Sequence, residues 1–170
     1  MSMTIPEPIL PRKWALKAHN QRVVLSKGMN ESARHVIMKG MLWALYLPHY
    51  PTLTIEIRIG DRYKPDLVAF DPQPNIFAAD KPLFWGESGV VSQDKIASII
   101  RRYPDTHFAW AKWDADLRPT VATLQKAVDR IKRTAPFDVV RFPADSLTQF
   151  VDEAGEVHIS HNQLEWMRLE

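Results

Sequence analysis

The chain has 170 residues, of which 45% are hydrophobic and 25% are charged, and this composition is typical of one folded domain and excludes a disordered chain. It contains no cysteine, which excludes disulfide frameworks, thiolate metal sites and cysteine nucleophiles. The formal net charge is only +2, but residues 1–50 carry seven Lys or Arg against two Glu. This surplus suits a polyanionic partner, although an ordinary solvated surface also produces such asymmetries.

No stretch reaches the roughly 20 apolar residues that a membrane helix needs. The longest candidate, residues 36–47, is shorter and contains Lys39. Residues 1–13 contain prolines and lack an apolar core before a small-residue cleavage site, so they do not resemble a secretory signal. We therefore expect a cytoplasmic protein with a single domain over residues 1–170, in which the Pro-containing residues 1–12 form a loose arm.

The first predicted elements are a hairpin and a buried helix. Residues 13–27 alternate between apolar and polar side chains on both sides of His19-Asn20, which predicts a β-hairpin. Asn30 is a good N-cap, and Glu31 in the first helical turn suits the positive end of a helix. The segment that follows is apolar almost all round up to the prolines after residue 47, so we expect a buried helix there.

Three strands are predicted next, over residues 53–59, 64–70 and 83–88, with a long Pro-rich connection at 71–82 before the third. Ser92 is expected to cap a helix over residues 92–103. The remaining pattern predicts a strand at 107–113, a helix at 120–134 and another strand at 137–142. The tail, from about residue 144, is expected to have a short helix, a turn at Gly155 and a weakly patterned end.

Two acids occupy corresponding places in this pattern. Asp66 follows Pro65 in the second predicted strand, and Glu87 stands at the end of the third. If these strands pair antiparallel, the two carboxylates can be neighbours on one face of the sheet. Paired carboxylates repel each other, and a divalent cation is the usual means of keeping both ionised. Such an ion can activate water and stabilise the charge on a phosphate.

Pro65-Asp66 and Glu87, on the order helix, three strands, helix and strand, resemble the PD-(D/E)XK phosphodiesterase superfamily. The resemblance implies a restriction-endonuclease-like α/β fold with an αβββαβ core, in which a mixed central sheet is flanked by helices. It also implies that Asp66 and Glu87 bind Mg²⁺ or Mn²⁺, that Glu31 from the first helix completes the site, and that the partner is nucleic acid.

The sequence departs from this family pattern at one position. A Lys normally follows two residues after the Glu, but Gly89 stands there. Some members move this Lys to the following helix, where Lys95 and Gln93 are the candidates for a catalytic role. The N-terminal hairpin, the Asn30-Glu31 helix start and the segments KPDLVAFD and WGESG are most similar to the YaeQ branch, over roughly residues 13–113.

Two functions remain open. One is a metal-dependent phosphodiesterase or nuclease acting on nucleic acid, and the other is a non-catalytic protein of the same fold that binds protein or nucleic acid, which Gly89 favours. Each candidate residue also has a structural reading: Asp66 and Glu87 as solvated strand ends, Glu31 as a first-turn acid, and Lys95 and Gln93 as surface residues.

Other sites have weaker signals. His158, His161 and Glu165 would have metal-ligand spacing on a helix, but Val157 and Ile159 favour a strand, which would separate them. No glycine-rich phosphate loop, dinucleotide fingerprint or serine-nucleophile elbow is present.

Overall fold

The computed structural model describes residues 5–73 and 81–170. Residues 5–12 form no helix or strand, as expected for an arm, while residues 1–4 of that prediction lie outside the described part. The predicted connection 71–82 also lies partly outside it, at 74–80. Across the described ranges, none of the helices has the length and apolarity needed to cross a bilayer.

The N-terminal hairpin is confirmed. Strands β1 (Lys13–Ala18) and β2 (Gln21–Ser26) pair antiparallel as a separate two-stranded sheet. His19 and Asn20 have φ angles of 50° and 64°, the left-handed conformation that a two-residue hairpin turn requires. The hairpin packs on helix α1 (Ala33–Tyr46) at Gly40, where an added Cβ would lie 2.5 Å from Leu16 Cδ1. Glycine therefore permits this close approach.

Helix α1 is buried as predicted, but its predicted start is wrong. Ser32, not Asn30, is the N-cap, and its side chain accepts a hydrogen bond from the His35 N–H. Glu31 consequently lies before the helix rather than in its first turn. Its carboxylate accepts a hydrogen bond from the Gly28 N–H, so it serves the preceding loop.

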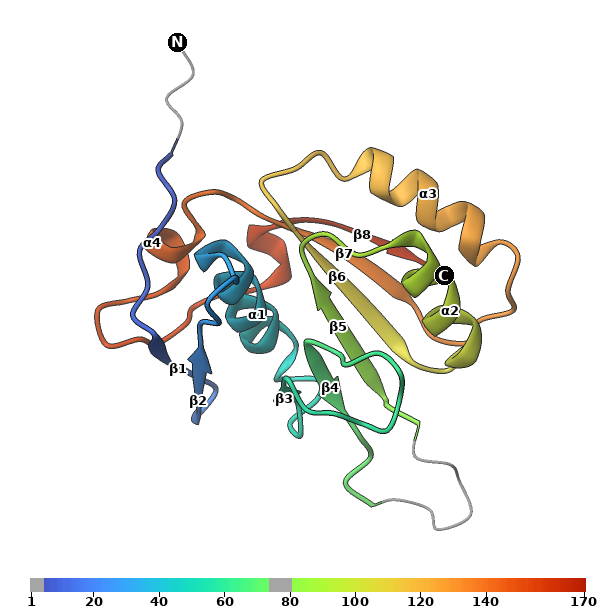
Figure 1. The fold of residues 1–170 in the computed structure, drawn as a ribbon, viewed down its shortest axis with the longest axis horizontal. Coiled ribbons are helices and arrows are strands. Elements are labelled where there is room, and N and C mark those ends of the chain that lie inside the picture. Colours follow the sequence, from blue (N-terminus) through green and yellow to red (C-terminus); the bar gives the residue numbers. More distant parts are fainter. Residues whose placement is uncertain (1–4, 74–80) are drawn as a thin grey trace.

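Within the described residues, the central sheet has six strands in the order β3-β4-β5-β6-β7-β8 (Figure 1). Their bounds are Thr54–Ile55, Leu67–Ala69, Phe84–Ser88, His107–Trp113, Phe137–Phe142 and Glu165–Leu169. The pairs β5–β6 and β6–β7 are parallel, and the other three pairs are antiparallel. With α1 first and helix α2 (Gln93–Arg102) between β5 and β6, the predicted αβββαβ order and mixed sheet are confirmed.

Several predicted boundaries are wrong. Strand β4 covers Leu67–Ala69 instead of 64–70, so Asp66 lies just before the strand and not within it. Strand β3 covers two residues instead of 53–59, because Glu56 adopts the left-handed conformation, with φ 57°. Helix α3 (Arg118–Val128) begins earlier and ends earlier than 120–134. Its start accommodates a proline in the first turn, where no N–H is needed. Beyond its end, Arg133 donates instead to backbone carbonyl groups near the end of α2.

The tail contains structure that the sequence did not predict. A short helix was expected and α4 (Ser146–Phe150) is present, but β8 was not predicted. This strand pairs antiparallel with β7 along the edge of the sheet.

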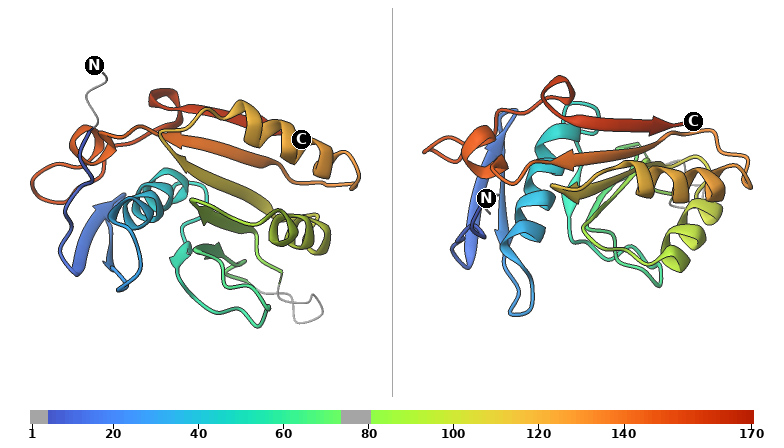
Figure 2. Two further views of the ribbon diagram at one scale, coloured as in Figure 1. Left: turned by 45° about the horizontal axis from the view of Figure 1, so that its top comes forward. Right: turned by 90° about the horizontal axis from the view of Figure 1, so that it is seen from above.

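Helix α1 covers one face of the sheet, and α2 and α3 cover the other (Figure 2). Each face carries a separate apolar core. Ala109 and Ala111 of β6 face α1, whereas Phe108 and Trp110 face α2 and α3. The small side chains on the first face let α1 approach closely. At Gly86 of β5, on that face, an added Cβ would lie 3.1 Å from side-chain atoms of α1 and β4. Larger side chains on this face would force α1 away from the sheet.

Candidate metal centre

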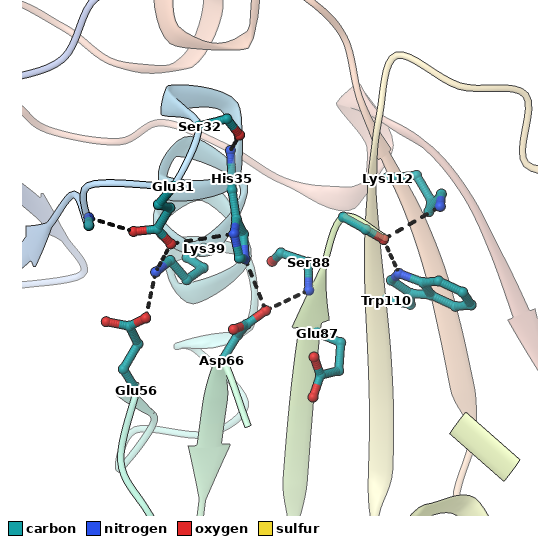
Figure 3. A network of polar contacts seen from close by, with 12 residues as sticks. Glu31, Ser32, His35, Lys39, Glu56, Asp66, Glu87, Ser88, Trp110 and Lys112 are labelled. Carbon is teal, nitrogen blue, oxygen red and sulfur yellow. Dashed lines mark hydrogen bonds and ion pairs between the residues drawn. The ribbon is translucent and has the colours of Figure 1, made fainter. Parts of the chain in front are cut away.

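Strands β4 and β5 bring Asp66 and Glu87 together. Asp66 lies just before β4, and the antiparallel pairing of Leu67 with Gly86 brings it beside Glu87 of β5 (Figure 3). The Ser88 N–H donates a hydrogen bond of 2.9 Å to Asp66 Oδ2, which fixes the aspartate against the neighbouring strand. The predicted antiparallel pairing is therefore confirmed, and the two acids lie next to each other.

Glu87 is a buried acid whose charge is incompletely compensated. Its side chain is 5% exposed, and Oε1 accepts a 2.8 Å hydrogen bond from Trp85 Nε1. Lys95 Nζ of α2 forms an ion pair with the same oxygen at 2.7 Å. Burial and the negative charge of Asp66 nevertheless raise the pKa of Glu87, and Lys95 and Trp85 only partly oppose them. An additional cation would stabilise the ionised pair.

His35 of α1 links Asp66 to Glu31. Its Nε2 lies 3.3 Å from Asp66 Oδ2, and its Nδ1 lies 3.4 Å from Glu31 Oε2. The hydrogen bond with Asp66 raises the pKa of His35 although burial opposes it. The imidazolium form, which donates from both nitrogens, is thereby favoured between the two carboxylates.

Lys39 is buried between two further carboxylates. Its Nζ lies 2.6 Å from Glu31 Oε2 and 2.7 Å from Glu56 Oε1, and its side chain is 1% exposed. Burial disfavours the charged ammonium, but the two carboxylates outweigh it and raise the pKa of Lys39. The left-handed turn at Glu56 ends β3 and directs its side chain to this lysine (Figure 3). A lysine is rarely buried unless it is paired in this way.

The two predicted candidates on α2, Lys95 and Gln93, lie in different surroundings. Lys95 reaches Glu87, as the prediction of a displaced lysine requires. Gln93 is exposed and lies in the lining of a cavity between α2 and α3. Residues two apart on a helix do not share a face, so a helix that directs Lys95 to Glu87 directs Gln93 elsewhere.

Glu31 does not join the carboxylate pair directly. Burial favours its neutral form, but hydrogen bonds from Lys39 and the Gly28 N–H outweigh this effect and lower the pKa of Glu31. It reaches Asp66 only through His35. Within residues 5–73 and 81–170, no three acidic or histidine side chains are arranged as a metal site.

The alternative site in the tail does not assemble either. His158 pairs with Asp152, while His161 packs edge-on against the rings of Tyr46 and Trp166. Glu165 pairs with Arg141 instead of joining the two histidines.

Asp66 and Glu87 nevertheless fit one hard divalent cation. Mg²⁺ is commonly held by one or two carboxylates, with waters and substrate phosphate oxygens as the other ligands. Among the contacts of the described residues, Asp66 Oδ1 and Glu87 Oε2 have no hydrogen bond. The hydroxyl of Ser88, the residue that follows Glu87, is also buried without a hydrogen-bond partner among the described residues. The pair therefore presents free oxygens for a cation or its water shell.

Sequence reasoning did not identify His35, Lys39 or Ser88 as site residues. The first two follow Glu31 at intervals of four residues, so a helix places them on one face, and this spacing was available in the sequence. The apolar residues around Lys39 obscured the signal.

No protein-family model matches the sequence, and no curated protein matches it significantly. Solved structures are similar. The YaeQ protein from Pseudomonas syringae superposes with a TM-score of 0.58 at 15% identity, over 83% of this chain and 75% of that one. The YaeQ protein from Xanthomonas axonopodis pv. citri gives a TM-score of 0.55 at 13% identity, over 88% and 82% of the two chains.

These similarities agree with the resemblance in the sequence and with the observed hairpin, mixed sheet and packed helices. At such low identity they concern the fold. The protein has a YaeQ-like α/β fold.

Proposed function

We propose that this protein is a phosphodiesterase that uses Mg²⁺ or Mn²⁺ to cleave nucleic acid. The observation that carries the proposal is the position of Asp66, just before β4, beside Glu87 of the antiparallel neighbour β5, with Glu87 buried and its pKa raised. Buried acids whose pKa is raised beside another carboxylate are concentrated at functional sites.

In this proposal, Asp66 and Glu87 hold the cation through the oxygens that lack hydrogen bonds. When bound, a divalent cation supplies an activated water and stabilises the charge that develops on the phosphate. Glu31 has a more remote role than the family resemblance implies, because it acts on Asp66 through His35. The protein residues hold the carboxylates in place and provide positive charge around the phosphate.

Lys95 is the proposed catalytic lysine. Its ammonium contacts Glu87 and is 19% exposed, so it can reach both the carboxylate pair and a substrate at the surface. An ammonium in this position would donate hydrogen bonds to a phosphate oxygen as negative charge accumulates there. Gln93 has no comparable contact with the acids, so its catalytic role remains a weaker proposal than that of Lys95.

A second candidate is a non-catalytic binding protein of the same fold. It is favoured by the internal neutralisation of the acids, because Lys39, Lys95 and His35 each pair with a carboxylate. In this alternative, the positive side chains take the place of a metal ion at the site.

The two functions are separated by incubating the purified protein with labelled single-stranded and duplex DNA and RNA in Mn²⁺ or Mg²⁺. Asp66→Asn and Glu87→Gln are expected to abolish cleavage. Asp71→Asn is the matched control, because this exposed acid lies beyond the other end of β4 and should leave cleavage unchanged. Equal cleavage by wild type and Asp66→Asn would expose a contaminant, and no cleavage of any substrate would favour the binding protein.

A further inference from the structure

A cavity of about 540 Å³ lies between α2 and α3, on the face of the sheet opposite α1. Its helical walls include the apolar residues Ile96, Ala97 and Leu124. Three cations also line it: Lys112, Lys126 and Arg130. An apolar interior combined with cations suits a ligand with a flat organic part and a negative charge.

The cavity begins next to the candidate metal centre. Val90 and Val91 line it, and Gly89 is two residues beyond Glu87, so at most about 7 Å of extended chain separates Glu87 from Gly89. Trp110 Nε1 donates a 2.7 Å hydrogen bond to the Gly89 carbonyl group (Figure 3). This bond joins the cavity wall to the loop that follows Glu87. The separation of Glu87 and Gly89 is comparable with the distance between neighbouring phosphates of a nucleic-acid strand.

Lys112 supplies a positive charge that no acid neutralises within the described part of the chain. Its Nζ lies 3.5 Å from the Gly89 carbonyl oxygen and 4.7 Å from the centre of the Trp110 ring. Burial lowers the pKa of Lys112. Lys126 and Arg130 likewise form no ion pair with a described acid. Asp94 is the one acid that lines the cavity among the described residues, so its lining has a positive surplus.

We propose that this cavity binds the nucleotide next to the phosphate held at Asp66 and Glu87, so that the preferred substrate is single-stranded nucleic acid. Lys112 contacts the phosphate of that nucleotide, and its base packs between α2 and α3. The inference rests on the proposed function for the position of the scissile phosphate. The binding site itself depends only on the cavity and its cations.

The shape of the cavity favours a single strand over a duplex. A base in a duplex is stacked and paired, and it must leave the stack before it can enter a space between two helices. Bases of a single strand are already free to pack against apolar side chains, while cations follow the backbone. A flexible strand therefore enters at a lower energetic cost than a duplex.

The cavity can be filled without disturbing the core. Thr123 is an exposed residue of α3 that lines the cavity, whereas the adjacent Ala122 is exposed but does not line it. Thr123→Trp should block entry of the base, and Ala122→Trp adds the same side chain to the same helix elsewhere. For the charge, Lys112→Met is paired with Lys13→Met, because Lys13 is an exposed lysine of the hairpin. Circular dichroism and thermal melting would verify that each variant is folded.

Binding of a fluorescein-labelled oligothymidylate would be measured by anisotropy in EDTA, with a duplex of equal length as the comparison. We expect Thr123→Trp to weaken single-strand binding about tenfold, the effect of losing one packed base, and Ala122→Trp to change it little. Lys112→Met should reduce the slope of log affinity against log salt by about 0.7, the value for one single-strand phosphate contact. Lys13→Met should leave the slope unchanged.

The outcomes separate the two proposals. If folded Thr123→Trp and Lys112→Met bind the oligonucleotide like wild type, or if wild type prefers the duplex, the cavity inference is wrong whether or not the protein cleaves nucleic acid. If these variants lose binding while Mn²⁺-dependent cleavage is absent, the cavity is a nucleic-acid site and the proposed phosphodiesterase activity is wrong.

Discussion

Asp138 and Glu87 are two buried acids on the same sheet whose surroundings have opposite effects. Asp138 of β7 accepts hydrogen bonds from Tyr46 at 2.7 Å and from Arg168 at 2.8 and 3.0 Å, and His107 Nε2 lies 2.7 Å away. Burial favours the neutral acid, but these partners outweigh it and hold the pKa of Asp138 well below its usual range.

Glu87 has fewer partners and a carboxylate neighbour, and its pKa is raised. The difference shows that burial alone does not distinguish a structural acid from a candidate functional one. The balance between donors and nearby negative charge distinguishes them. Asp138 joins α1, β6, β7 and β8 in a closed network, whereas the Asp66–Glu87 pair retains a need for positive charge.

The largest expected effect is the loss of the Asp138 network. Asp138→Ala leaves Arg168, His107 and Tyr46 without their shared acceptor, so we expect a loss of about 3–5 kcal/mol in the free energy of unfolding. Urea denaturation at neutral pH measures it. Glu7→Ala, which breaks a surface pair with Arg34, should cost less than about 1 kcal/mol. Equal losses would remove the distinction between a network and a pair.

A smaller loss is expected for Lys39→Met. The lysine is buried, but its partners Glu31 and Glu56 are 15% and 38% exposed and can regain water when it is removed. We expect a decrease of about 1.5–3 kcal/mol in the same urea experiment, the range for hydrogen bonds to charged groups. Lys13→Met on the exposed hairpin provides the baseline. A Lys39→Met protein as stable as this control would show that the internal ion pairs contribute little.

Glu87→Gln should behave in the opposite way to Asp138→Ala. Removing a charge that burial and Asp66 disfavour relieves repulsion, so in EDTA we expect unchanged stability or a gain of up to about 1 kcal/mol. Thermal or urea unfolding of the metal-free protein tests this. A loss as large as that of Asp138→Ala would mean that Glu87 is a structural acid.

The subtlest effect is on the pH dependence of unfolding. Folding lowers the pKa of Asp138. Its contribution to the free energy of unfolding is therefore fully present above pH 3.8 and is lost as the pH falls through the pKa of the folded state. Folding raises the pKa of Glu87. Its contribution to the free energy of unfolding is therefore fully present below pH 4.5 and is lost as the pH rises through the pKa of the folded state. Glu87→Gln should therefore flatten the decrease in stability above pH 4.5 in metal-free protein. An unchanged profile would contradict the raised pKa.

The elements that the sequence predicted well have strong local signals. Strands β5, β6 and β7 and helix α2 carry clear apolar patterns, and Ser92 caps α2 as expected. Tertiary contacts decide the elements that were missed. Strand β3 ends where Glu56 turns toward Lys39, and β8 exists through its pairing with β7. Such distant partners leave no periodic signal in a single sequence.

The candidate site was predictable in its acids and in Lys95, but not in its other counter-ions. Asp66 and Glu87 could be placed because strand order and antiparallel pairing bring them together, and Lys95 followed from the gap at Gly89. Lys39 lies in an apolar run, and its role depends on Glu56, which is 17 residues away. Asp138 was equally inconspicuous in a short strand, since its partners come from three separate elements, α1, β6 and β8.

Calorimetric titration of the metal-free protein with Mn²⁺ tests most directly whether Asp66 and Glu87 form a cation site. We predict one site in the wild type, which is lost in both Asp66→Asn and Glu87→Gln and retained in Asp71→Asn. Absence of binding to the folded wild type, or binding that survives both substitutions, would contradict the assignment of these two acids as a metal centre.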